Sequence, residues 1–363
     1  MRIAFRTDAS LSIGTGHLSR CLTLADSLKS QGWDTLFLCR DIAPAFSAQI
    51  TARGHKLTVM QTPTGATPNG DRLAHSSWLA VTQESDAEET LNALKSQRWD
   101  WMAVDHYALD WRWETPLRGL AANILAIDDL ADRRHDCDIL LDQNLTDLRI
   151  DRYAGLTPPA CRKLIGVSYA LLRPEFSHDG RRDQAPGASK RLNILFGGTD
   201  PQGGTELALR AVSLLDPTLA IATDVIIGSG NVRQPAIREL CQALPGAQLH
   251  IQTSDIAELF AAADLAIGAG GATSWERCRL GLPALVTSMA HNQRRACEAL
   301  AQARVAIDLG ELALLTPGTL AGTIARILAK PRLLAAMSQR ASKLVDGKGT
   351  QRVAAHLVDR HTV

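Results

Sequence analysis

The sequence predicts two α/β domains, each built on a parallel β-sheet with helices on both faces. With 363 residues, the chain is too long for one ordinary domain and comfortable for two. Short apolar runs alternate with helical patterns almost from end to end, which is typical of parallel sheets. A polar stretch rich in turn formers interrupts this alternation around residues 177–191, so we expect the domain boundary to fall there.

The first half contains six short apolar runs that we expect to be strands. They are Arg2–Phe5, Thr35–Leu38, Lys56–Met60, Trp101–Val104, Ile124–Ile127 and Ile139–Leu141. Helical patterns separate them. The pattern after the first run places its apolar residues on one helix face, at Leu18, Cys21, Leu22, Ala25 and Leu28.

The second half repeats the alternation after the polar stretch. Its predicted strands are Leu192–Phe196, Thr223–Ile227, Gln248–Ile251, Leu265–Ile267, Ala284–Val286 and Ala306–Asp308. Helical patterns include Gly204–Leu215 and Ser254–Ala263. We therefore predict a first domain over residues 1–176, a linker over 177–190 and a second domain over 191–363, with the last helix free to return to the first domain.

Composition excludes several classes of partner. Lys and Arg number 39 against 38 Asp and Glu, and no basic tract stands out, so nucleic acid is not expected. No apolar run reaches the length of a membrane span, and the start does not resemble a signal peptide, so a cytoplasmic protein without a membrane partner is expected. Seven scattered cysteines without a C-x-x-C pair favour reduced thiols over disulfides or zinc, and neither a metal nor a cofactor is predicted.

A glycine-rich loop follows the first predicted strand and ends at His17. Gly14 and Gly16 let the backbone turn tightly and approach a ligand closely. A histidine in the first turn of a helix feels the positive end of the helix dipole, which favours the neutral imidazole that a general base needs. The alternative is a histidine that only caps or packs the loop.

The second glycine-rich loop follows the strand Leu265–Ile267. Gly270 and Gly271 are predicted to leave backbone N–H groups open for a diphosphate, and Thr273 to cap the next helix or bind a phosphate oxygen. Glu276, one turn into that helix, is placed to accept hydrogen bonds from both hydroxyls of a ribose. The competing interpretation makes Glu276 the capping-box partner of Thr273.

Other strand ends carry weaker signals. Gly198, in the loop Phe196–Asp200, either faces the ligand or belongs to a plain tight turn. Asn292 and Gln293 follow the strand Ala284–Val286, where their amides are suited to acetamido groups. Six further residues are candidates for the lining of the sugar pocket. The alternative is that they form ion pairs or belong to the core. They are Trp78, Asp105, His106, Tyr107, Asp128 and Asp129.

Taken in order, these loops resemble one family over nearly the whole chain, the UDP-sugar hydrolases of the pseudaminic acid pathway. The matching segments are Arg6–Ser10, Ile13–His17 with Arg20–Cys21, Ile127–Ala131, Phe196–Asp200, Gly270–Cys278 and Asn292–Gln293. The resemblance implies the GT-B fold, in which two Rossmann-like domains face a central cleft.

The resemblance also implies an activity and roles for residues. Members hydrolyse UDP-2,4-diacetamido-2,4,6-trideoxy-β-L-altropyranose at the anomeric carbon. His17 is implied to take a proton from water, Arg173 to contact the substrate and Glu276 to bind the nucleotide. Attack opposite the leaving group predicts inversion, and no step needs a metal. The implied role is in flagellar or surface-glycan synthesis, and we expect a monomer or weak dimer.

Three other functions remain open at this stage. A GT-B glycosyltransferase has the same nucleotide site and passes the sugar to an acceptor instead of water. A nucleotide-sugar 2-epimerase is a second enzyme alternative. A non-catalytic nucleotide-sugar binding protein is the third, and His17 in its loop argues against it.

Overall fold

A computed structural model of the chain describes residues 1–10, 13–62, 72–177 and 190–359. The chain forms two compact units, one comprising Met1–Leu171 and Lys348–Val363 and the other comprising Leu172–Gly347. The predicted linker over 177–190 lies outside the described residues except at its two ends.

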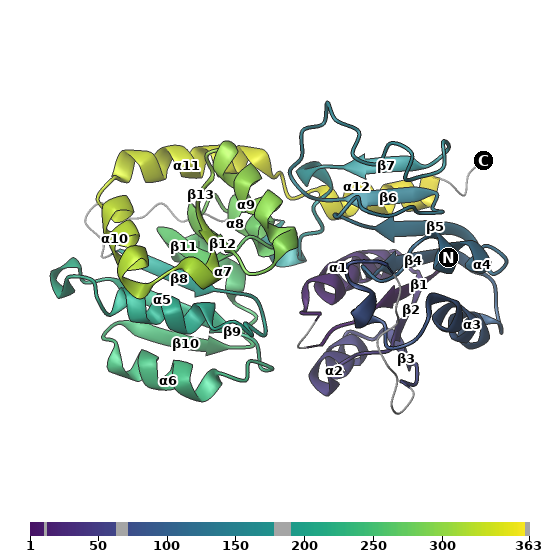
Figure 1. Cartoon of the computed structure of the whole chain (residues 1–363), viewed down its shortest axis with the longest axis horizontal. Coiled ribbons are helices and arrows are strands. Elements are labelled where there is room, and N and C mark those ends of the chain that lie inside the picture. Colours follow the sequence, from purple (N-terminus) through teal and green to yellow (C-terminus); the bar gives the residue numbers. More distant parts are fainter. Residues whose placement is uncertain (11–12, 63–71, 178–189, 360–363) are drawn as a thin grey trace. The chain divides into compact units, whose positions relative to one another are not determined.

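The first unit is built on a seven-stranded parallel sheet with the order β3-β2-β1-β4-β5-β6-β7 (Figure 1). The strands are β1 (Arg2–Thr7), β2 (Asp34–Cys39), β3 (Lys56–Val59), β4 (Trp99–Asp105), β5 (Ala121–Ile127), β6 (Ile139–Asp142) and β7 (Arg162–Ile165). Both faces of this sheet are buried. Along β1, for instance, Ile3 and Phe5 enter one hydrophobic core while Ala4 enters the other.

Helices cover both faces of this sheet. They are α1 (Gly16–Ser30), α2 (Pro44–Ala52), α3 (Gln83–Leu94), α4 (Trp111–Leu117) and α12 (Gly349–Asp359), with short 3-10 turns η1 (Ser76–Trp78) and η2 (Val167–Tyr169). Helices α1, α2 and α12 contribute to one core, and α3 and α4 to the other. The C-terminal helix α12, drawn in yellow, therefore belongs with the first half of the chain (Figure 1). The indole of Trp101 donates to the carbonyl of Leu357 at 3.1 Å and helps to hold it there.

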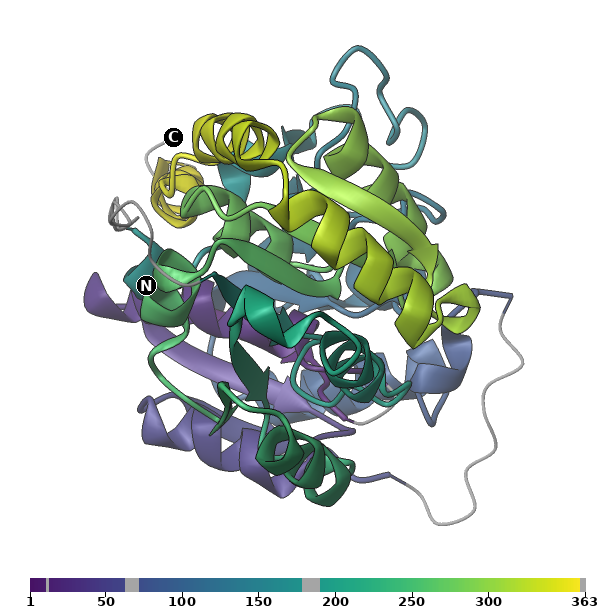
Figure 2. The same cartoon turned by 90° about the vertical axis from the view of Figure 1, so that its left-hand side faces the viewer.

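The second unit has a six-stranded parallel sheet with the order β10-β9-β8-β11-β12-β13. The strands are β8 (Arg191–Leu195), β9 (Ala222–Ile227), β10 (Ala247–Ile251), β11 (Leu265–Ala269), β12 (Ala284–Ser288) and β13 (Ala306–Glu311). The helices are α5 (Gly204–Val212), α6 (Gln234–Ala243), α7 (Ile256–Ala262), α8 (Thr273–Arg279), α9 (His291–Gln302), α10 (Pro317–Leu328) and α11 (Pro331–Leu344), with η3 (Pro174–Phe176), η4 (Pro217–Leu219) and η5 (Leu312–Leu314). Helix α5 lies beside α6 and α10 and shares their core (Figure 2).

Every predicted strand is present, and β7 is the strand that the sequence analysis missed. Its four residues begin with Arg162 and Lys163, so the apolar run is too short to be recognised. Its place is fixed by pairing with β6 at the sheet edge, where one side needs no partner.

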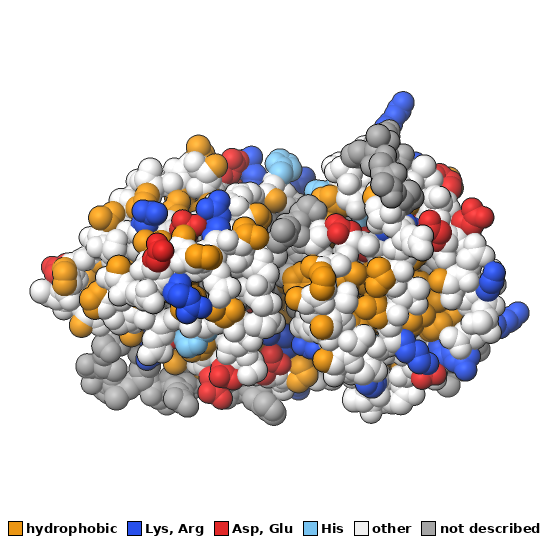
Figure 3. All heavy atoms as spheres, turned by 90° about the horizontal axis from the view of Figure 1, so that it is seen from below, with side chains coloured by type: hydrophobic (Ala, Val, Ile, Leu, Met, Phe, Trp, Pro, Cys, Tyr) orange, Lys and Arg blue, Asp and Glu red, His pale blue; other side chains and the backbone are white. Residues whose placement is uncertain are grey.

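The distribution of charged side chains on the surface agrees with the nearly equal numbers of acidic and basic residues. On the face that Figure 3 draws, acidic and basic side chains are interspersed and do not gather into one basic area. None of the helices within the described ranges is long and apolar enough to cross a membrane.

Candidate active site

The strand order of the first sheet reverses between β1 and β4, which are parallel neighbours with Thr7 opposite Asp105. In open α/β sheets, ligands bind beyond the carboxyl ends of the strands at such a point. The loop after β1 leads into α1, and His17 is the second residue of that helix. The fold thus brings His17 to the end of β4.

His17 and Asp105 form a buried hydrogen-bonded pair. The Nδ1 atom of His17 lies 2.6 Å from Oδ1 of Asp105, whose side chain is fully buried, while the His17 side chain keeps 8% exposure. Because a carboxylate only accepts hydrogen bonds, we assign the imidazole hydrogen to Nδ1. The lone pair of Nε2 is then available to accept a proton.

Arg20 holds the same carboxylate from one turn further along α1. Its Nε lies 2.6 Å from Oδ2 of Asp105 and its Nη2 lies 2.7 Å from Oδ1, while Nη1 reaches Asp129 at 3.1 Å. Burial alone would raise the pKa of Asp105, but the charge of Arg20, followed by that of His17, holds it well below its usual range. Asp105 therefore stays anionic and orients the imidazole.

Aromatic rings surround His17. Its ring centroid lies 4.5 Å from that of Tyr107 and 5.9 Å from that of Trp78, both edge-on, and Trp78 stacks on Tyr107 at 5.5 Å. Tyr107 is buried and donates its hydroxyl hydrogen to Asp129, so it forms part of the wall behind His17. Trp78 is half-buried, which leaves part of its ring accessible.

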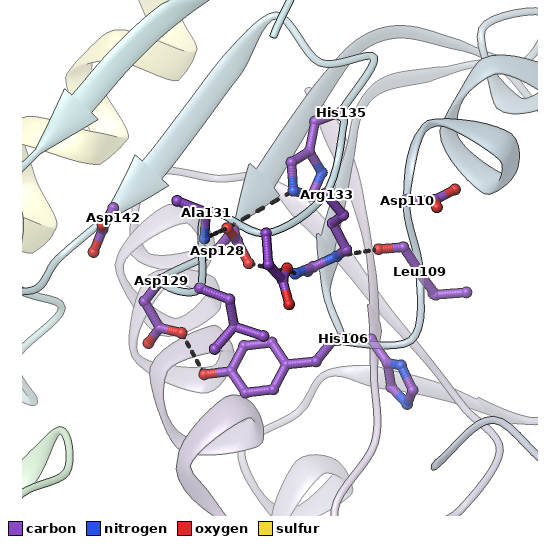
Figure 4. Close-up of polar contacts among 12 residues, drawn as sticks. His106, Leu109, Asp110, Asp128, Asp129, Ala131, Arg133, His135 and Asp142 are labelled. Carbon is purple, nitrogen blue, oxygen red and sulfur yellow. Dashed lines mark hydrogen bonds and ion pairs between the residues drawn. The ribbon is translucent and has the colours of Figure 1, made fainter. Parts of the chain in front are cut away.

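Asp128 belongs to a separate buried ion-pair network (Figure 4). Its carboxylate lies 2.7 Å from Nη1 of Arg133 and accepts from the Ala131 N–H at 2.9 Å. His135 lies 3.9 Å from Asp128 and 2.7 Å from Glu114. Because Asp128 is fully buried, the suggestion that its carboxylate binds sugar is wrong, and ion pairing explains it. In the part of the chain that the structure describes, no group of three His, Cys, Asp or Glu side chains is arranged to hold a metal ion.

His106 is likewise buried, with Nε2 3.2 Å from Asp8. Burial lowers its pKa despite the opposing effect of Asp8. His106 and Asp105 are therefore not surface residues of a sugar pocket, which corrects that expectation. Asp105 instead supports His17 from behind.

In the second unit, Glu276 is paired with Arg173. The guanidinium donates from Nε to Oε1 at 2.9 Å and from Nη2 to Oε2 at 3.1 Å. Helix α8 begins with Ala272 as its N-cap and has no side-chain cap. The capping-box interpretation of Thr273 and Glu276 is therefore wrong, and both Glu276 oxygens serve Arg173.

The two glycines before α8 have different surroundings. The N–H of Gly270 donates to the carbonyl of Thr287 at 3.2 Å, and a Cβ at Gly270 would lie 2.2 Å from Sγ of Cys297. The prediction that this N–H is open for a diphosphate is therefore wrong, and Gly270 is needed for packing. Around Gly271 there is open space where a Cβ would project, so this glycine remains the candidate for ligand contact.

The remaining predicted residues lie in loops that follow strands or in the first turns of α1 and α9. Gly14 has a φ of +81°, and around both Gly14 and Gly16 a Cβ would meet no atom within 4 Å. Gly198 accepts from the N–H of Gly228 at 3.1 Å. Gln293 accepts from the N–H of Met289 at 3.0 Å, and Asn292 beside it is half-buried.

Asp200 explains the third glycine-rich loop. Its carboxylate accepts from the N–H groups of Gly204 and Thr205 at the start of α5, at 2.9 and 2.8 Å. The donors that an anion would need at this helix are thus already used, which favours the plain turn there.

Sequence reasoning missed the positioning roles of Asp105 and Arg20. The sequence predicts Asp105 as a strand-end candidate for the sugar pocket and includes Arg20 only as part of a motif. The sequence signal is an acid at the end of the strand that pairs with β1, together with a basic residue three positions after the candidate base. Recognising it requires the strand order, which one sequence does not display.

Two known proteins are similar in sequence to parts of this chain. No protein-family model matches the chain. Over 197 residues it is 30% identical to the spore coat polysaccharide biosynthesis protein SpsG of Bacillus subtilis, a match of 53% of this chain and 57% of that protein. The chain thus matches little more than half the length of this relative. Over 262 residues it is 27% identical to the UDP-2,4-diacetamido-2,4,6-trideoxy-β-L-altropyranose hydrolase of Campylobacter jejuni, covering 71% of this chain and 81% of that enzyme.

Solved structures establish the fold. MurG of Acinetobacter baumannii superimposes with a TM-score of 0.64 over 99% of both chains at 18% identity. The spinosyn rhamnosyltransferase SpnG complexed with thymidine diphosphate gives 0.61 over 98% of this chain and 100% of that one, also at 18% identity. With its two parallel Rossmann-like sheets, the chain has the GT-B fold, which confirms the predicted fold class.

Proposed function

We propose that this protein hydrolyses UDP-2,4-diacetamido-2,4,6-trideoxy-β-L-altropyranose to UDP and the free sugar, with His17 as general base. The observation that carries the proposal is the 2.6 Å contact of His17 Nδ1 with the buried carboxylate of Asp105. This contact leaves Nε2 as the proton acceptor and fixes the ring. The likeness to the Campylobacter jejuni hydrolase supports the choice of substrate.

The chemistry needs one activated water and a stabilised leaving group. Nε2 of His17 accepts a proton from water as its oxygen attacks the anomeric carbon on the face opposite UDP. The bond from that carbon to the phosphate oxygen breaks, its electron pair leaves with UDP, and the sugar is released with inversion. A positioned base typically contributes a factor of about 100 to 10,000. Asp105, anionic and held by Arg20, stabilises the imidazolium that forms.

The second unit supplies the nucleotide site in this proposal. Glu276 is placed to accept hydrogen bonds from ribose hydroxyls, and the open face of Gly271 permits close approach of the diphosphate. Arg173 then has two roles in this proposal, because it orients Glu276 and places a positive charge beside that carboxylate. Asn292 and Gln293 remain candidates for the acetamido groups, and Thr273 for a phosphate oxygen.

The test is UDP release from this UDP-sugar in the presence of EDTA, with no acceptor added. Wild type, His17→Ala and the control His356→Ala on α12 are compared after their folding is verified. We expect fast release by wild type and control, and a loss of at least about 100-fold in His17→Ala. Equal release by all three would remove His17 as the base while keeping the activity. No release by folded wild type would reject the hydrolase for this sugar.

A glycosyltransferase is the second candidate function, and the observation that favours it is the structural likeness to MurG and SpnG. It predicts UDP release only when an acceptor is present. Measuring release with and without a panel of hydroxyl acceptors separates the two candidates.

A further inference from the structure

Arg277 is a buried cation with two unused nitrogens. Its side chain lies between β11 and α8, and the residue is 1% exposed. Nη2 donates to the carbonyl of Ala269 at 2.7 Å and to Oγ of Ser274 at 2.9 Å. Within the described residues, Nε and Nη1 have no hydrogen-bond partner. Most buried arginines are paired, because an isolated charge in a protein interior is costly.

The residues around Arg277 do not neutralise it. The carboxylate of Glu276 attracts the Arg277 guanidinium electrostatically, but it already forms two hydrogen bonds with Arg173. The neighbouring thiols of Cys278 and Cys297 are neutral, because burial raises the pKa of each to about 12. Arginine itself does not give up its proton in proteins. The positive charge therefore persists without a counter-charge of its own.

The chain makes room for this guanidinium at the end of β11. A Cβ on Gly268 would lie 2.8 Å from Nη1 of Arg277 and 2.1 Å from the carbonyl oxygen of Leu195 on β8. Strand order in the second sheet reverses between these two strands. This cation thus lies near the carboxyl ends of two central strands, where ligands of this fold class bind, and it contacts Ala269, two residues before the open Gly271.

We propose that Arg277 determines specificity for a nucleoside diphosphate, whose negative charge at the Gly271 loop neutralises this buried cation. The inference rests on the nucleotide site of the proposed function, but not on whether water or an acceptor takes the sugar. Arg277 acts through its electric field, which falls off slowly where solvent is excluded. It raises the affinity for UDP relative to uridine, which shares the base and ribose but lacks the charge.

The test compares the affinities of the full-length chain for UDP and uridine by calorimetry and by competition. Arg277→Met removes the charge at similar length, and Arg277→Lys keeps it. Arg279→Gln is the matched control, because Arg279 lies on the same short helix and hydrogen-bonds the carbonyls of Phe176 and Ser177. We expect Arg277→Met to reduce the UDP-to-uridine affinity ratio at least about tenfold, and Arg277→Lys and Arg279→Gln to change it less than about threefold.

Each outcome is decisive. An unchanged ratio in folded Arg277→Met, or an equal loss of affinity for both ligands, would overturn the inference and leave the proposed function intact. Wild type that binds no UDP would overturn both. Should Arg277→Met not fold, Arg277→Gln, which also removes the charge, takes its place, and the measurement is how much more UDP raises the unfolding temperature than uridine does. A difference much smaller than in wild type supports the inference, and an unchanged difference overturns it.

Discussion

Arg173 holds both oxygens of Glu276, although 103 residues separate them in the chain. Sequence analysis assigned each of them separately to the ligand, one to the substrate and one to the nucleotide. The structure shows that they form one hydrogen-bonded ion pair. A ribose that approaches Glu276 must therefore share or displace a guanidinium that is already bound in a two-pronged geometry.

Breaking this pair is expected to destabilise the protein. Arg173→Gln leaves a mostly buried Glu276 carboxylate without its cation, and we expect a loss of about 2 kcal/mol in the free energy of unfolding, measured with urea. The matched control is Arg149→Gln, whose partner Asp147 forms the same two-pronged contact while the Arg149 side chain is 89% exposed. The control should leave stability nearly unchanged, because an exposed ion pair is screened by solvent. Equal effects at both sites would contradict the importance of burial.

Asp105→Asn tests the orientation of His17. The amide keeps the shape of the side chain but loses the charge and can donate to Nδ1, which favours the tautomer with its hydrogen on Nε2. We expect kcat for UDP release to fall at least about 100-fold with little change in KM, by analogy with the triad aspartate of serine proteases. Asp147→Asn, in an exposed ion pair, is the control. A rise in KM at unchanged kcat would assign Asp105 to substrate binding instead.

The sequence indicated the layers of the fold well and the partners within the site poorly. Alternating apolar runs are local, so strands such as β1 and β11 could be recognised from their own residues. The pairs Asp105 with His17 and Arg173 with Glu276 join positions 88 and 103 residues apart, and only the strand order brings them together. Arg277 shows the same limit. It is buried against Ala269, a contact that its place one residue after Glu276 does not indicate.

His135 makes stability depend on pH. Burial lowers its pKa, but Glu114 and Asp128 outweigh that effect and raise it from 6.5 to about 9. The folded state therefore holds the proton more tightly than the unfolded chain does, so the stabilisation is complete below pH 6.5 and is lost as the pH rises through about 9. The unfolding free energy of wild type relative to His135→Gln should fall by about 3 kcal/mol between about pH 6 and about pH 10. A constant difference across this range would reject the raised pKa.

Gly270 and Gly271 are expected to differ in how substitution by alanine affects stability. In Gly270→Ala the new methyl group would lie 2.2 Å from Sγ of Cys297, so α9 or the loop must shift, and we expect a loss of about 1–3 kcal/mol in urea unfolding. Gly271→Ala meets no atom within 4 Å and should leave stability within about 0.5 kcal/mol, while its methyl group obstructs close approach of a ligand. UDP affinity should therefore fall in folded Gly271→Ala. Full UDP affinity in that variant would show that the diphosphate does not approach the backbone at Gly271.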